Sequence, residues 1–180
     1  IVVVGDTAVT IIGHAFGDDR EGSGEVICFN PGSGDERWRT RPDRMQESGD
    51  LDDAFISGPP IILHDLVVVP LRKVNSRMET IEFVVGLDLD SGDLRWLRTL
   101  VSSGGVRMAG NRGFSRLDLV DEDIMFSSPV GAVARLDGAT GHPRWLRRFE
   151  VPLRTPRNIQ LPWETGGSAI LETGIVFIAP

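Results

Sequence analysis

The chain has 180 residues, of which 41% are hydrophobic and 25% charged, and it carries a formal net charge of −7 with a pI near 4.9. This composition is typical of a globular protein that is long enough to bury a sizeable core. The acidic balance disfavours nucleic acid as a partner, because phosphates call for a basic face. No apolar run approaches the ~18 residues of a membrane span.

The cysteine content and the two ends of the chain limit the class of protein further. Cys28 is the only cysteine, which excludes an internal disulfide and any multi-cysteine metal or haem site. It lies in the apolar run VICF, where we expect a buried, inert thiol. The chain begins inside an apolar run and ends at IVFIAP, so we expect a segment of a longer protein whose targeting signals lie elsewhere.

Short segments rich in β-branched residues, separated by Gly, Asp, Ser and Pro, predict an all-β protein. In chain order they are IVVV (1–4), AVTII (8–12), EVICF (25–29), PIIL (60–63), LVVVPL (66–71), IEFVVGL (81–87), SRLDLV (115–120), IMFSS (124–128), AVARL (132–136), SAIL (168–171) and GIVFIA (174–179). Only residues 42–49 have the composition of a brief helical turn. Several strands are apolar throughout, which indicates sheets covered on both faces.

An eleven-residue pattern recurs three times, as CFNPGSGDERW (28–38), GLDLDSGDLRW (86–96) and RLDGATGHPRW (135–145). Each copy places Asp or Asn three residues before Ser or Thr, Gly directly after it, and Trp four residues further on. A pattern that recurs at near-regular spacing indicates a repeat protein.

The aspartates around Gly92 allow two interpretations, a calcium loop or a tight turn between strands. An EF-hand loop needs Gly at position 6 and a bidentate Glu at position 12. Counted from Asp88, position 6 is Asp93 and position 12 is Thr99, so the calcium interpretation fails. In a hairpin, Asp or Asn accepts nearby backbone N–H groups and Gly supplies a positive φ. We therefore predict three equivalent hairpin turns.

Each repeat resolves into four strands, the last of which contains the Trp of the pattern. Four-stranded antiparallel units of about 40 to 50 residues are the blades of a β-propeller. We predict a partial β-propeller that belongs to a larger one, with three blades and the start of a fourth. The expected blades cover residues of about 1–40, 56–100, 115–150 and, for the incomplete one, 166–180. Polar, Gly-rich connectors such as 40–58 and 101–114 join them.

The fourth strand of each blade places its Trp among arginines, as in Arg37-Trp38-Arg39, Arg95-Trp96 and Arg144-Trp145. Charge on an outermost strand reduces edge-to-edge pairing. A Trp that lies on the neighbouring blade buries a large apolar area. The sequence therefore predicts that the three tryptophans fasten each blade to the next.

The repeated pattern resembles the tryptophan-docking motif, Ala-x-Asp-x-x-Thr-Gly-x-x-x-Trp, of pyrrolo-quinoline-quinone-like (PQQ-like) β-propeller repeats. With the preceding strands, the resemblance covers nearly the whole chain. The motif's Ala is replaced by Cys28, Gly86 and Arg135, which puts the close packing in question, above all at Arg135. The residues that match the docking motif are Asn30, Ser33, Gly34 and Trp38, then Asp88, Ser91, Gly92 and Trp96, then Asp137, Thr140, Gly141 and Trp145.

The resemblance implies three outcomes, since one fold hosts many functions. The chain is similar to quinoprotein dehydrogenases, which hold PQQ and a calcium ion in a central channel. It is also similar to the periplasmic lipoprotein propeller that scaffolds outer-membrane β-barrel assembly, and to propeller sensor or interaction domains of bacterial envelope proteins. The dehydrogenases carry adjacent cysteines, a catalytic Asp, and Glu, Asn and Asp ligands for calcium; this sequence shows one isolated cysteine.

Other polar clusters are expected to be structural or solvated. The carboxylates of LDLVDED sit at a strand end and in its turn, and His64-Asp65 lies in a turn without a partnered Ser. Gly22-Ser23-Gly24 and Gly32-Ser33-Gly34 lack the third Gly and the helix of a dinucleotide site. The remaining candidates are His14 and His142, which stand alone, and the basic run Arg144, Arg147, Arg148, Arg154 and Arg157, expected at a solvated strand edge.

The sequence thus favours a non-catalytic binding or scaffold module of an extracytoplasmic bacterial protein, located in the periplasm, in the cell envelope or outside the cell. We expect a protein partner and further blades of the same protein as its contacts, and no catalytic, cofactor-binding or metal-binding residue in this segment. The alternative is part of a PQQ-dependent alcohol or sugar dehydrogenase, for which PQQ and calcium would be the cofactors.

Overall fold

The structure, a computed structural model, describes residues 1–13, 23–46, 48–77, 79–103 and 114–149, and the strand residues 168–170 and 176–178. The first sheet is antiparallel, in the order β1 (Val2–Val4), β2 (Thr7–Ile12), β3 (Glu25–Phe29) and β4 (Glu36–Thr40). The strands β1 to β3 match the predicted segments, because each is rich in β-branched residues and bounded by turn residues. The strand β4 is the predicted fourth strand that contains the Trp of the motif.

The second sheet repeats this order, and its last three strands are longer: β6 (Ile61–Leu63), β7 (Leu66–Val74), β8 (Thr80–Asp88) and β9 (Leu94–Ser103). It gains one more strand, β5 (Phe55–Ile56), which pairs with the far end of β7. The sequence did not predict β5, since two residues are too few for a periodic pattern.

The third sheet contains β10 (Arg116–Val120), β11 (Asp123–Ser128), β12 (Ala132–Asp137) and β13 (Pro143–Arg148). Two further strands, β14 (Ser168–Ile170) and β15 (Val176–Ile178), form an antiparallel hairpin. This hairpin corresponds to the predicted start of a fourth unit.

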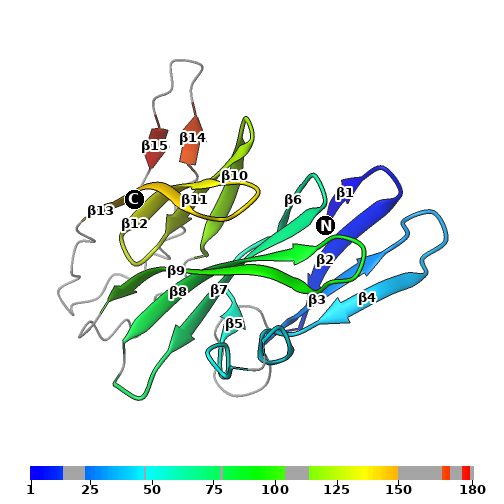
Figure 1. Cartoon of the computed structure of the whole chain (residues 1–180), viewed down its shortest axis with the longest axis horizontal. Coiled ribbons are helices and arrows are strands. Elements are labelled where there is room, and N and C mark those ends of the chain that lie inside the picture. Colours follow the sequence, from blue (N-terminus) through cyan, green and yellow to red (C-terminus); the bar gives the residue numbers. More distant parts are fainter. Residues whose placement is uncertain are drawn as a thin grey trace, which may run out of the picture.

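The sheets follow one another around a common side of the molecule (Figure 1), on which β1, β6, β10 and β14 are neighbours. Thus β1 lies beside β6, β6 beside β10, and β10 beside β14. Every strand pair is antiparallel, and the described residues contain no α-helix. The predicted fold class, a partial β-propeller of antiparallel blades, is confirmed, and we call the three complete sheets blades 1, 2 and 3.

Blade 2 has an apolar core on each face because its side chains alternate along the strands. On β7, Val67, Val69 and Leu71 face blade 1, whereas Leu66 and Val68 face blade 3. The alternation continues on β8, where Val85 belongs to the first core and Val84 to the second. The continuous apolar runs of β7 and β8 therefore reflect burial on both faces, as predicted.

The connector between blades 1 and 2 is partly buried, which corrects the expectation of a polar linker at 40–58. Its helical turn is a single 3-10 turn, η1 (Pro42–Arg44), shorter than the predicted 42–49. Beyond this turn, Met45, Leu51 and Ala54 are 1–7% exposed and belong to the first core. Single apolar residues in a polar stretch carry no periodic signal, so their burial depends on tertiary contacts that the sequence pattern does not reveal.

None of the helical segments in the described parts of the chain has the length and hydropathy needed to cross a membrane.

Candidate functional site: the blade junctions

The three motif turns have the same backbone structure in all three blades. In each, the first residue's N–H donates to a carbonyl five residues on, at 2.9, 2.8 and 2.8 Å for Asn30, Asp88 and Asp137. The glycine N–H donates back to the carbonyl of the first residue at 2.7–2.8 Å, and the glycines have φ values of +68° to +80°. Each blade also has a register shift just before the turn. The turns at positions 30, 88 and 137 are thus equivalent hairpins.

The side chain of the first turn residue also holds each turn in shape. Asn30 Oδ1 accepts the backbone N–H groups of residues 32 and 33 at 2.8 and 3.1 Å. Asp88 Oδ1 accepts those of residues 90 and 91 at 3.0 and 2.9 Å. Asp137 Oδ1 accepts both the N–H and the hydroxyl of Thr140, at 3.0 and 2.8 Å. In each turn, one side-chain oxygen thus accepts hydrogen bonds from two donors of the turn that would otherwise bind water. Asp and Asn commonly rigidify turns in this way.

Trp38 of blade 1 lies on the motif turn of blade 2. Its Nε1–H donates to the carbonyl of Leu89 at 2.8 Å, and the indole is 8% exposed. A Cβ atom built on Gly92 would lie 2.7 Å from Cδ2 of the indole, so the ring packs directly on the glycine backbone. Within blade 1, the cross-strand partner of Trp38 is Cys28, which is fully buried. Burial raises the pKa of the Cys28 thiol, as expected for an inert cysteine.

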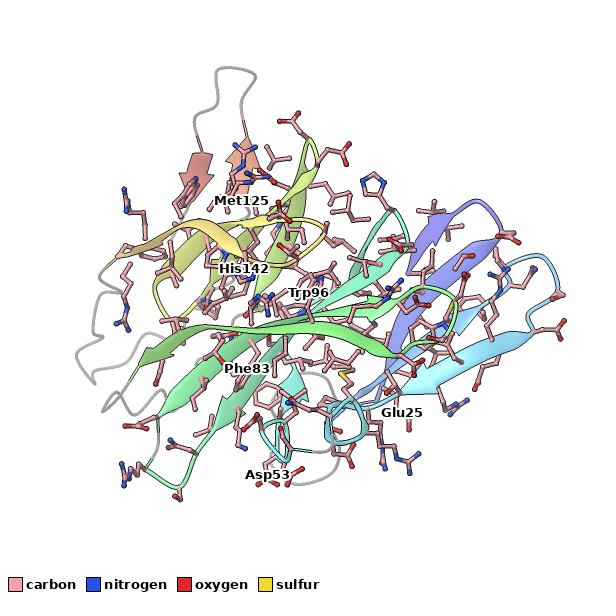
Figure 2. The ribbon with its side chains drawn as sticks, in the orientation of Figure 1. Glu25, Asp53, Phe83, Trp96, Met125 and His142 are labelled. Atoms are coloured by element: carbon pink, nitrogen blue, oxygen red, sulfur yellow. The ribbon has the colours of Figure 1, made fainter. Side chains whose placement is uncertain are left out.

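Trp96 of blade 2 occupies the equivalent place on blade 3, between the two sheets in Figure 2. It is 7% exposed, and a Cβ atom on Gly141 would lie 2.5 Å from its Cε3. Its cross-strand partner is Gly86, where a Cβ atom would lie 2.3 Å from Cε2. The glycine that replaces the motif's Ala therefore lets the ring approach the strand closely. Unlike Trp38, Trp96 has no hydrogen-bond partner for Nε1 among the described residues.

Trp145 of blade 3 is half-buried, and its cross-strand partner is Arg135. The described residues of the next unit, in β14 and β15, do not include a motif turn on which Trp145 could lie. Arg135 is directed into ion pairs instead of packing as the motif's Ala would, with Nε 2.6 Å from Asp123 Oδ2. Arg135 can therefore occupy the position of the motif's Ala because its charge pairs with Asp123 within blade 3.

An arginine directly before each Trp pairs with an aspartate in the first hairpin of the same blade, which the sequence analysis missed. Arg37 Nη2 lies 2.9 Å from Asp6, Arg95 Nη2 lies 3.2 Å from Asp65, and Arg144 Nε lies 2.8 Å from Asp123. In blades 2 and 3 the same arginines also reach the motif carboxylate, at 2.8 and 3.0 Å. The recurrence of Arg-Trp was visible in the sequence, but the aspartate partner of each arginine lies 21 to 31 residues earlier along the chain.

Asp123 corrects the expectation that the carboxylates of LDLVDED lie in a solvated turn. Asp121 and Glu122 are exposed as expected, but the side chain of Asp123 is 5% exposed. It accepts hydrogen bonds from Arg135 and Arg144 at 2.6 and 2.8 Å. Two guanidinium groups offset the desolvation of this one carboxylate, which makes Asp123 the charged centre of blade 3.

The other polar candidates lie apart from one another. His64 is exposed, with a positive φ of 54°, and its ring contacts Glu122 of the next hairpin. His142 takes part in the motif turn through its backbone, which accepts the Asp137 N–H at 2.8 Å. In the basic run, Arg148 Nη2 donates to the carbonyl of Ser102 in blade 2 at 2.7 Å, so this strand edge is not merely solvated. The candidates outside the described residues are His14, Gly22, Arg154 and Arg157.

The motif carboxylates make the hairpins sensitive to acid. Hydrogen bonds from the hydroxyl and N–H of Thr140, and the nearby Arg144, lower the pKa of Asp137. The N–H groups of Ser91 and Asp90, with Arg95, lower the pKa of Asp88. A lowered folded-state pKa stabilises the protein above the unfolded value of about 3.9, and this contribution is lost as pH falls through the folded-state pKa.

Asp137→Asn tests this acid sensitivity, because Asn30 shows that an amide can accept the same turn hydrogen bonds. We expect the variant to melt at a lower temperature than the parent at neutral pH, since it loses the charge that pairs with Arg144. The difference in Tm should shrink as pH falls below the unfolded-state pKa of about 3.9 and further through the lower folded-state pKa. Thermal melts across this pH range are the measurement, and a Tm difference independent of pH would refute the role of the ionised carboxylate.

No group of three or more His, Cys, Asp or Glu side chains in the described ranges is placed to hold a metal. Several carboxylates are held by arginines: Asp123 by two of them, Asp88 by Arg95, and Asp118 by Arg116 at 3.1 Å. A calcium site needs six to eight oxygens that converge on one point.

No family model matches the chain, and no curated protein is significantly similar to it. Among solved structures, the chain is similar to BamB from Moraxella catarrhalis, with 22% identity over 80% of this chain and 34% of that one and a TM-score of 0.45. It is also similar to a quinohemoprotein alcohol dehydrogenase from Comamonas testosteroni (13% identity, 71% and 18% of the two chains, TM-score 0.44). A third similar structure is a europium-containing methanol dehydrogenase (15% identity, 71% and 29%, TM-score 0.46).

The chain spans about a third or less of the length of these proteins. At such identities and TM-scores the likeness concerns the fold alone, and it does not separate a binding protein from a dehydrogenase.

Proposed function

We propose that these blades belong to a non-catalytic PQQ-like propeller module, which acts as a binding or scaffold domain of an extracytoplasmic bacterial protein. The observation that carries this proposal is the engagement of buried and half-buried carboxylates in ion pairs within each blade. Asp123, Asp88 and Asp137 each pair with an arginine of their own blade. These charges stabilise the scaffold instead of converging on a ligand.

A scaffold role suits a propeller because its rigid blades present loops at fixed positions, and binding residues are concentrated in such loops. The hairpin ends carry carboxylates whose side chains are 73–86% exposed and therefore accessible to a partner; these are Asp6, Asp65, Asp121 and Glu122. We therefore propose a protein partner for this module. The extracytoplasmic location in this proposal rests on the resemblance to the PQQ-like family.

Isothermal titration of the full-length protein with PQQ in the presence of calcium tests the proposal. We expect no saturable binding heat. Binding of PQQ with a Kd below about 1 μM would instead overturn the non-catalytic assignment. The matched variants Asp118→Asn and Asp90→Asn then locate the site. Binding that is lost in the first variant and kept in the second would place a ligand on β10 and restore the alternative, a quinoprotein dehydrogenase.

A further inference from the structure

A buried ion pair lies in the junction of blades 2 and 3. Arg72 on β7 is 6% exposed and Glu82 on β8 is fully buried, and Arg72 Nε donates to Glu82 Oε1 at 2.7 Å. Both side chains are on the strand face that meets blade 3. Removing two charges from water is costly unless pairing and further hydrogen bonds compensate for it.

Blade 3 supplies those further hydrogen bonds. Ser115, just before β10, donates its hydroxyl to Glu82 Oε2 at 2.8 Å, and Ser128, at the end of β11, donates to Oε1 at 3.1 Å. Ser115 Oγ also accepts from Arg72 Nη2 at 3.3 Å. The carboxylate thus binds donors from both blades. We call Arg72, Glu82, Ser115 and Ser128 the Glu82 hub.

Backbone hydrogen bonds beside the Glu82 hub also hold the segments that lead into blades 2 and 3. The N–H of Ser115 donates to the carbonyl of Ser57 at 2.8 Å, and the N–H of Ser57 donates to the carbonyl of Pro70 at 2.9 Å. The ring of Phe55 on β5 lies 6.0 Å from Arg72 Cζ. The hub is therefore the point where the connector before blade 2, blade 2 itself and the start of blade 3 meet.

The two junctions of blade 2 use different polar contacts. Toward blade 1, the indole N–H of Trp38 makes a directional bond to Leu89. Toward blade 3, the indole N–H of Trp96 has no such bond among the described residues. Apolar contact is non-directional and does not by itself define how two sheets are registered, whereas hydrogen bonds are directional. The Glu82 hub supplies directional contacts where the indole does not.

We propose that the Glu82 hub is a registry lock that fixes how blade 3 seats on blade 2. Buried ion pairs contribute little net stability compared with apolar side chains of the same size, but they penalise every arrangement that leaves the charge unpaired. A shifted blade 3 would remove both serines from Glu82. This inference concerns the seating of the blades and stands independently of the ligand or partner of the module.

Hydrogen exchange of Glu82→Gln in the full-length protein tests the lock, with Glu79→Gln as the matched control. Glu79 lies on the same hairpin, and its carboxylate accepts a hydrogen bond from Asn75 Nδ2 of that hairpin at 2.7 Å. We expect amides of β10 and β11 to exchange about tenfold faster or more in Glu82→Gln, which corresponds to a lost hydrogen bond to a charged group. Amides of β2 to β4 should be unchanged, and Glu79→Gln should leave all blades unchanged.

An unchanged exchange rate in β10 and β11, or an equal increase in all three blades, would overturn the lock. If Glu82→Gln does not fold, the double variant Ser115→Ala/Ser128→Ala takes its place, because it removes the two hydroxyl groups of blade 3 and keeps both charged side chains. The Arg72–Glu82 pair then stays intact, and the same local increase in exchange is expected.

A second experiment separates an effect on the seating of blade 3 from an effect on overall stability. Arg72→Met/Glu82→Leu should keep a Tm near that of the parent, since apolar replacement of a buried pair is often neutral or stabilising. Its β10 and β11 amides should nevertheless give several or broadened NMR resonances. A single sharp set of resonances with the exchange protection of the parent would show that the seating does not depend on the Glu82 hub.

Discussion

Trp96→Ala is expected to lower the free energy of unfolding of the full-length protein by roughly 3–5 kcal/mol, the usual range for truncating a buried aromatic side chain. Trp96 is 7% exposed, packs on Gly141 of blade 3 and belongs to the second core. Its removal leaves a cavity between two sheets, which the strands cannot close without moving a blade. Chemical denaturation of the parent and the variant gives the difference directly.

Two further variants make this result specific to the junction. Trp96→Phe should cost less than the Ala variant, because a six-membered ring still fills part of the space. Thr99→Ala, on the exposed side of the same strand, should stay within about 0.5 kcal/mol of the parent. A Trp96→Ala variant that is as stable as Thr99→Ala would mean that the indole does not hold blades 2 and 3 together.

Gly141→Ala should be destabilising by about 2–5 kcal/mol, as the sum of two separate costs. The glycine has a φ of +68°, which costs an L residue about 1–2 kcal/mol. The new Cβ would also lie 2.5 Å from the ring of Trp96, so that the indole must shift, with overpacking costs of about 1–3 kcal/mol. Thermal and chemical unfolding report the total.

Gly34→Ala is the matched control, because Gly34 occupies the same turn position in blade 1. Its φ is +80°, but no described atom beyond its chain neighbours lies within 4 Å of the Cβ position. Only the backbone strain of about 1–2 kcal/mol is expected there. Combining Gly141→Ala with Trp96→Ala should recover the overpacking part, so that the two costs are not additive. Equal effects of the two glycine substitutions would exclude close packing at Gly141.

Much of the fold could be predicted because the same local physics recurs in each blade. The β-branched runs and the Asp/Asn-x-x-Ser/Thr-Gly turns specify strands and hairpins from neighbouring residues alone. The order of strands follows, since short turns join adjacent antiparallel strands. Trp38 and Trp96 could be assigned to the junctions because an indole on an outer strand needs a surface to cover it.

The residues that sequence reasoning missed all depend on contacts between distant parts of the chain. Asp123 looks like a turn carboxylate until Arg135 and Arg144 fold back onto it. Glu82 reads as one polar residue in an apolar strand, and its serine partners are 33 and 46 residues away. Leu51 lies in a polar connector and is buried only because blades 1 and 2 enclose it. No local pattern marks such partners.

The most direct test of the account is the exchange rate of the Trp38 indole N–H with solvent, followed by NMR in the full-length protein. If successive blades dock through these tryptophans, this N–H donates to Leu89 of the next blade at 2.8 Å and is shielded by an 8% exposed ring. We predict that it exchanges only when the junction opens, orders of magnitude more slowly than a free indole. Exchange at the rate of a free indole would contradict tryptophan docking and, with it, the propeller arrangement of the blades.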